Sequence, residues 1–216
     1  MKALRFLPAI AVLAISFVSC KSKTSDAPPL FCDTVCFKDT LKFTGTHALA
    51  PSVFILAKDC APDTIMWTYK GMGSFRKTTF DFSDIKMNKD YVRCIFKDTG
   101  YAYILFNDCL TGRGYQIKLP FDKKASFIMK SSGINNTDRR FSIADNIVAH
   151  TDRGNIFIQD MNTGKTAMMT FGKEIELDYD NIHNYIDSVN ITNERIWVKV
   201  KIDGEWAVKE KKFTWE

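Results

Sequence analysis

Residues 155–171 have the sequence NIFIQDMNTGKTAMMTF, and this stretch contains the pattern that decides the fold. The run 155–159 is rich in isoleucine and phenylalanine, and 166–171 is a second β-prone run. Between the two runs, Asp160 is followed by Asn162, Thr163 and Gly164, which favour a tight turn. The stretch therefore predicts a β-hairpin.

The same hairpin pattern occurs four times along the chain. In each copy an apolar run ends at an aspartate, turn residues follow, and a second β-prone run comes next. The aspartates are separated by 49, 52 and 43 residues, and they are Asp59, Asp108, Asp160 and Asp203. A β-prone run precedes three hairpins, at 91–96, 147–151 and 189–191, and another follows three hairpins, at 78–82, 126–130 and 174–179. The repeat predicts an all-β fold of four antiparallel β-meander units.

Units of four strands that recur at roughly 40 to 50 residues resemble the blades of a β-propeller. The Asp-x-x-Thr-Gly turn that begins at Asp108 and at Asp160 is similar to turns found in many propeller blades. The last unit lacks a fourth strand after Trp215, and we expect residues 35–43 to supply it, as the other end of the chain does in closed propellers. A β-sandwich or an open meander is the alternative.

The first 20 residues have the features of a cleavable export signal. Lys2 and Arg5 give a basic start, residues 6–18 are almost entirely apolar, and small Ser19 stands before Cys20. The apolar run is shorter than the roughly 20 residues that a membrane-spanning helix needs. We therefore expect a cleaved signal peptide rather than a permanent transmembrane anchor.

This arrangement resembles the lipobox of bacterial lipoproteins, in which the cysteine becomes the first residue of the mature chain and carries acyl groups such as palmitate. Leucine is usual three positions before that cysteine, whereas Phe17 stands there, as in the relaxed signals of Bacteroidota lipoproteins. The resemblance implies lipidation of Cys20 and a protein held at a membrane of the bacterial cell envelope. An ordinary secretory signal is the alternative.

The same resemblance sets the expected domain boundaries and location. Residues 1–19 form the signal peptide, 20–30 a flexible tether and 31–216 a single all-β domain. Lys21 is unlike the acidic residue that retains lipoproteins at the inner membrane, so the outer membrane is favoured. The first acidic residue of the tether is Asp26, which favours the periplasmic face over the cell surface.

Five further cysteines lie in the first half of the mature chain: Cys32, Cys36, Cys60, Cys94 and Cys109. In an oxidising envelope compartment they are candidates for two disulfides and one leftover thiol, and the sequence leaves their pairing open. Their spacing does not give two matched pairs of zinc ligands, so we predict no metal site.

Charge and motif content restrict the classes of function. A net charge of +5 with interspersed signs argues against a nucleic-acid partner. The chain has no Gly-x-Ser-x-Gly turn, no phosphate-binding glycine loop and no His-Glu-x-x-His helix, and His47, His150 and His183 are far apart in sequence. We therefore predict no catalytic residues and no cofactor.

Four acidic residues alternate with apolar ones in the segment 174–180. Such a density of oxygens suits calcium, but the alternation is better explained by a strand with its acids in solvent and its apolar residues facing inward. We expect the second arrangement, because the loop geometry of calcium sites is missing.

Two functions remain open. The first is a non-catalytic binding or scaffold lipoprotein whose partner is an envelope protein or glycan. The second is an envelope hydrolase acting on glycans through Asp59, Asp108 and Asp160. Binding is favoured, because turn formation already explains an aspartate that recurs at equivalent turns.

Overall fold

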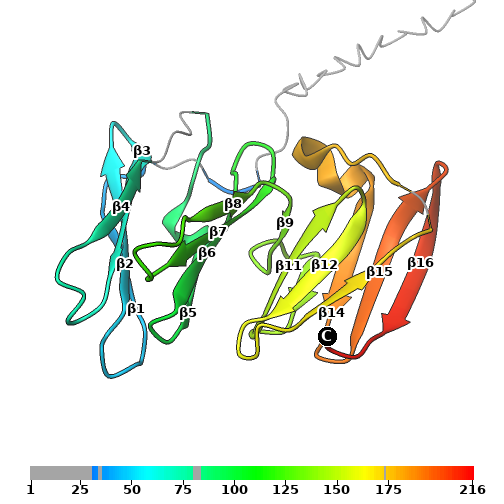
Figure 1. The fold of residues 1–216 in the computed structure, drawn as a ribbon. Helices are drawn as coiled ribbons and strands as arrows, with labels where there is room; N and C mark the ends of the chain where they lie inside the picture. Colours follow the sequence, from blue (N-terminus) through cyan, green and yellow to red (C-terminus); the bar gives the residue numbers. More distant parts are fainter. Residues whose placement is uncertain (1–30, 34–35, 80–83, 173) are drawn as a thin grey trace, which may run out of the picture.

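The computed structural model describes residues 31–216, except 34–35, 80–83 and 173. The signal peptide, Cys20 and the tether therefore lie outside the described residues. The described chain is all-β, with four sheets of four strands each (Figure 1). This confirms the predicted all-β class and the four units of four strands.

Each sheet contains a meander of three consecutive strands. The first sheet has the order β1 (Leu41–Thr44), β2 (Ser52–Lys58), β3 (Ala61–Thr68) and β4 (Arg76–Thr79). The second has β5 (Val92–Lys97), β6 (Tyr101–Asn107), β7 (Gly114–Pro120) and β8 (Ile128–Lys130). The third has β9 (Gly133–Ile134), β11 (Ile147–Asp152), β12 (Asn155–Asp160) and β13 (Thr166–Met169). The fourth has β10 (Phe141–Ile143), β14 (Ile186–Ile191), β15 (Arg195–Ile202) and β16 (Glu205–Lys212). Two short 3₁₀ helices, η1 (Lys89–Tyr91) and η2 (Tyr179–Asn184), precede β5 and β14.

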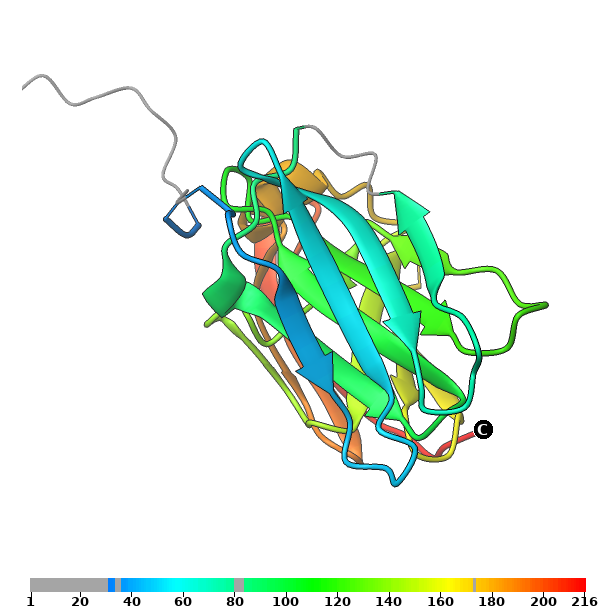
Figure 2. The same cartoon turned by 90° about the vertical axis from the view of Figure 1, so that its left-hand side faces the viewer.

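The sheets stack face to face in chain order. Figure 1 shows the first sheet at the left end of the stack and the fourth at the right, and Figure 2 shows the first sheet in front of the others. One apolar core lies between the first and second sheets and includes Val53, Trp67, Ile104 and Leu119. A second core lies between the third and fourth sheets and includes Ile156, Ile158, Ile186 and Val198. The molecule is thus two sheet pairs, each built around its own core.

The predicted aspartates occupy corresponding strands, but their turns are of two kinds. Each aspartate ends or follows the middle strand of its meander. Asp59 and Asp203 have positive φ values of 50° and 53°, a conformation that aspartate tolerates better than most residues. Asp108 and Asp160 instead accept hydrogen bonds from loop N–H groups, including those of Thr111 and Thr163. The aspartate that recurs in the four units therefore takes part in two different kinds of turn.

The middle strand of the third sheet, β12, runs in the opposite direction to β6, the middle strand of the second meander. Tyr101 begins β6, whereas Asp108 follows the end of that strand. The Tyr101 hydroxyl nevertheless donates to the carbonyl of Met161, 3.2 Å away, and Met161 directly follows Asp160. The Asp160 turn therefore lies near the start of β6, whereas the Asp108 turn lies at the end of that strand. The four aspartates thus do not all lie at the same end of the strands, as a uniform repeat would require.

The source of the fourth strands differs from the prediction in two sheets. Residues 174–179 do not form a strand of the third sheet; β9 joins that sheet beside β11 instead. The alternation nevertheless has the predicted effect on side-chain orientation, because Ile175 and Leu177 pack against the second core while the acidic side chains stay exposed. Residue 35 of the predicted segment 35–43 lies outside the described residues, and residues 36–43 do not complete the fourth sheet, since β1 pairs with β2; β10 completes it, in parallel with β14. Among the described residues, no strand pairing joins the fourth sheet to the first.

The second and third sheets approach each other closely at two glycines. A Cβ atom on Gly114 of β7 would lie 2.0 Å from the carbonyl oxygen of Gly133 in β9. A Cβ on Gly133 would in turn lie 2.8 Å from the Gln116 side chain. Only glycine at both positions permits this contact between the two sheet pairs.

We expect the substitution Gly114→Ala to lower the free energy of unfolding by about 2 kcal/mol, because the added methyl group forces β7 and β9 apart. Gly100→Ala is the matched control, since its Cβ would meet nothing closer than 3.4 Å and its φ is not positive. Denaturant unfolding of the two variants measures the difference. Equal unfolding free energies would show that the sheets do not depend on this contact.

Candidate functional site

The space between the second and third sheets differs from the two cores because much of it is polar. Its apolar part is small and consists of Tyr103, Leu105, Val148 and Met161 with two flanking residues. Beside it opens a groove of about 450 Å³, lined by residues of β6, β7, β8, β11, β12 and β13. We call this the seam groove, and its main side chains are Tyr103, Lys118, Lys130, His150, Phe157 and Gln159.

Strand alternation places these side chains in the seam. In β7, Ile117 and Leu119 point into the first core, so Gln116 and Lys118 point to the third sheet. In β11, Ala149 points into the second core, so the neighbouring His150 points to the second sheet. The groove is therefore lined by the faces of β7 and β11 that point away from the two apolar cores.

Two lysines lie close together on the second sheet. Gln116 pairs with Lys130 and Lys118 with Ile128, so the two lysines are diagonal neighbours on one face of β7 and β8. The ammonium group of Lys118 lies 4.3 Å from the centre of the Tyr101 ring. In the described part of the chain, no carboxylate lies within ion-pair distance of either lysine.

His150 faces Lys130 across the groove. Its Nε2 lies 2.6 Å from Lys130 Nζ, and its ring stacks on Phe157 with 5.4 Å between ring centres. Burial, followed by the charge of Lys130, lowers the pKa of His150 to about 4, against the opposing effect of Asp152. Burial also lowers the pKa of Lys130. At neutral pH the imidazole is therefore uncharged, its Nε2 accepts a hydrogen bond from the ammonium group, and Nδ1 carries the ring proton.

Tyrosine and amide side chains fix the wall of the groove. The Tyr103 hydroxyl donates to Oε1 of Gln159 at 3.1 Å, and the Gln159 amide donates to the carbonyl of Gly164 at 3.0 Å. Burial, with a smaller contribution from Tyr101, raises the pKa of Tyr103 to about 12, so its hydroxyl remains a donor. Gln116 donates to the carbonyl of Ala149 and so joins β7 to β11.

We expect an NMR titration to give His150 a pKa near 4, and the substitution Lys130→Gln to raise it, because a neighbouring cation is removed. The folded-state pKa lies below the unfolded value of 6.5, so the unfolded chain binds the proton first. His150 therefore stabilises the fold above pH 6.5, and this contribution is lost as the pH falls towards 4. Lys123→Gln, at an exposed turn, is the control variant. A His150 pKa that is the same with and without Lys130 would contradict the pairing.

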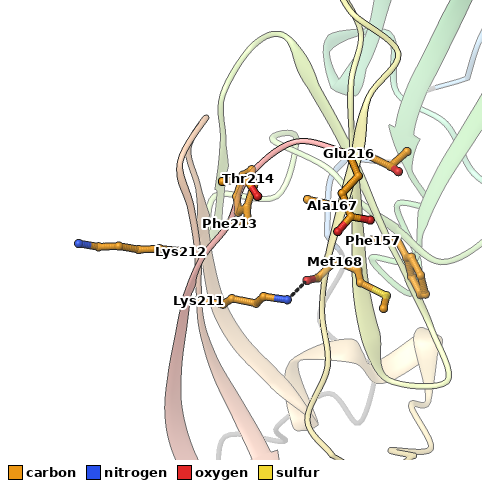
Figure 3. A pocket seen from close by; sticks show the side chains of 9 residues that line it. Phe157, Ala167, Met168, Lys211, Lys212, Phe213, Thr214 and Glu216 are labelled. Atoms are coloured by element: carbon orange, nitrogen blue, oxygen red, sulfur yellow. Dashed lines mark hydrogen bonds between the residues drawn. The ribbon is translucent and has the colours of Figure 1, made fainter.

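A second groove, of about 490 Å³, lies on the other side of β13 (Figure 3). It shares Phe157 with the seam groove. Lys211 reaches across it and donates to the carbonyl of Met168 at 2.9 Å, while Lys212 points away (Figure 3). Backbone hydrogen bonds also join Glu216 to Thr166 in both directions. Because the chain's own groups bridge this groove, we regard the seam groove as the candidate site.

The structure pairs four of the five cysteines considered in the sequence. The disulfides are Cys32–Cys109 and Cys36–Cys60, and Cys94 is a free thiol whose pKa is raised by burial. The two disulfides attach the start of the domain to the turn after β2 in the first sheet and to the turn after β6 in the second. In the entropic model, closing the longer loop stabilises the fold by roughly 4 kcal/mol. None of these cysteines lines the seam groove.

The three histidines have different surroundings. His47 is exposed in the turn between β1 and β2. His183 reaches the otherwise unpartnered Oδ2 of buried Asp138, with Nε2 2.7 Å from that oxygen. Of the three, His150 alone lines the seam groove.

The aspartates proposed for the hydrolase alternative do not line the seam groove, whose carboxylate is that of Asp152. Asp108 and Asp160 are buried and accept turn hydrogen bonds, as described above. Sequence reasoning also missed Lys118 and Lys130. The alternation of β7, with polar residues on one face and apolar residues on the other, is the signal that indicates a polar second face.

No family model matches the chain, and a search of the curated proteins finds no match. Within the described residues, no helix is long and apolar enough to cross a membrane. The same residues contain no group of three or more His, Cys, Asp or Glu side chains placed to hold a metal ion. The seam groove is therefore the feature from which we infer a function.

Proposed function

We propose that this chain is a lipid-anchored binding or scaffold protein of the bacterial envelope, and that an envelope glycan or protein binds in the seam groove. The supporting observation is that Lys118, Lys130 and neutral His150 gather with aromatic and amide side chains in one groove between two sheets. Concave sites with few polar groups among apolar ones are typical of ligand binding. In this proposal the protein belongs to the outer membrane, at its periplasmic face.

The four sheets act in this proposal like blades of an open propeller-like array, with the ligand between the second and third. The tether from Cys20 reaches the domain at the segment that the two disulfides attach to the first two sheets. The anchor is thus joined to one sheet pair, while the groove lies where that pair meets the other. A ligand in the groove contacts both pairs.

The composition of the groove favours binding over glycan hydrolysis. Glycoside hydrolysis generally uses two carboxyl groups on either side of the bond that breaks. The described lining of the seam groove has the single carboxylate of Asp152 beside two lysines. Cations, amides and aromatic rings are instead the groups that hold a ligand in place.

We expect the full chain, purified in a non-ionic detergent, to bind a member of a panel of envelope glycans and peptides saturably. Lys130→Gln should weaken that binding about tenfold, because a charged hydrogen bond is lost. Lys123→Gln, an exposed lysine outside the groove, should leave it unchanged. Isothermal calorimetry measures the affinities, and circular dichroism checks the fold. Binding that is insensitive to Lys130 would place the site elsewhere.

We expect Cys20 to carry acyl groups in the mature protein, because a basic start, an apolar run and a small residue precede it. Mass spectrometry of the mature amino terminus measures the modification, and fractionation places the protein with membranes. The substitution Cys20→Ala should abolish both, whereas Ser22→Ala, in the tether, should change neither. A Cys20→Ala protein that matures and remains membrane-bound would contradict the anchor.

A further inference from the structure

We infer that the seam groove binds a carboxylated sugar, with its carboxylate between Lys118 and Lys130 and its ring against Phe157 and Ile128. This inference rests on the proposed binding function and specifies the chemical class of the ligand. No residue of the groove is assigned a catalytic role.

The pair of lysines indicates an anionic ligand. Lys118 and Lys130 project from neighbouring strands on the same face, and no carboxylate of the described residues pairs with either. Side chains at diagonal positions of neighbouring strands are about 7–8 Å apart, so the two like charges repel, and more strongly in a partly buried groove than in water. The aromatic rings of Tyr101 and Tyr103 hold Lys118 in place, 4.3 and 5.8 Å from its ammonium group. An anion between the two ammonium groups would remove the repulsion and gain charge-assisted hydrogen bonds.

Asp152 limits the charge of that ligand. Its carboxylate lines the same groove, on the strand that carries His150. A ligand with several adjacent negative charges, such as a polyphosphate or an acidic peptide, would bring one of them towards Asp152. Hydroxyl groups would instead donate hydrogen bonds to this carboxylate. One carboxylate surrounded by hydroxyls is the chemistry of an acidic sugar.

Apolar groups complete the match. Phe157 is half-buried and lines the groove, and Ile128, also in the lining, is 54% exposed. A pyranose ring presents C–H groups on its faces, and these pack against aromatic and aliphatic side chains while its hydroxyls bond to polar ones. A carboxylated sugar would thus cover the exposed Ile128 side chain and pair with the two lysines beside it.

The size of the groove supports a small ligand. Its volume of about 450 Å³ lies within the roughly 300–1,000 Å³ typical of small-molecule sites. A sugar unit or a short oligosaccharide fits this space, whereas a folded partner would contact mainly the rim. β8 is an edge strand, and its residues Ile128 and Lys130 are exposed, so a longer glycan chain is able to continue beyond the groove on this side.

The test uses galacturonic acid, which carries a single carboxylate among its hydroxyls, and its methyl ester, which has the same ring without the charge. Calorimetry with the full chain in non-ionic detergent should show saturable binding of the acid and binding of the ester about tenfold weaker. Lys118→Gln and Lys130→Gln should each weaken binding of the acid about tenfold and remove its preference over the ester. Lys123→Gln is the matched control, and thermal unfolding confirms that each variant is folded.

Four other outcomes are informative. Equal binding of the acid and the ester would overturn the anionic part of the inference. Tighter binding of triglutamate than of galacturonic acid would replace the sugar by an acidic peptide. If neither acid binds but a panel ligand binds in a Lys130-dependent manner, the sugar class fails while the proposed function stands; if no ligand depends on the two lysines, both fail.

Discussion

The contact between Gly114 and Gly133 is the constraint on which the arrangement of the sheets depends. Each outer sheet is joined to its neighbour by an apolar core, but the second and third sheets share only a small one. At the two glycines the backbones of β7 and β9 meet with no room for a Cβ. Buried Asn135, just after β9, adds hydrogen bonds to the carbonyls of Phe106 and Tyr115 in the second sheet. The two sheet pairs are thus held together at one end of the seam by backbone approach and polar contacts.

This way of joining the pairs explains why a groove opens in the seam. Two sheets that share an apolar core pack tightly, because removing each apolar side chain from water lowers the free energy of the folded state. The seam instead contains Lys118, Lys130 and His150, which keep access to water, and buried Gln116, which donates to the carbonyl of Ala149. Sheets that meet at two glycines and share only a small apolar cluster leave space for a ligand between them. The same polarity that weakens the packing supplies the groups for recognition.

The exchange of β9 and β10 gives the carboxyl-terminal pair its own cohesion. β9 joins the third sheet, the next strand, β10, joins the fourth, and β11 returns to the third. Because the chain passes between the two sheets in this way, they cannot separate without breaking strand pairs as well as the core. The described strands of the amino-terminal pair show no such exchange, but two disulfides attach the start of the domain to both of its sheets. Each pair is therefore stabilised by a different means.

The sequence by itself determined the elements that depend on local chemistry. Alternation and β-propensity predicted most strands, and the turn residues after Asp108, Asp160 and Asp203 predicted the hairpins, because neighbours in sequence make those contacts. Only the tertiary structure decided which sheet β1, β9 and β10 join, the reversed direction of the third sheet and the meeting of Lys130 with His150. Short strands such as β9 carry too few side chains to specify a partner, so long-range packing chooses it. The groove likewise arises from strands distant in the chain, whose polar faces are visible as alternation in the sequence but meet only when the sheets are stacked.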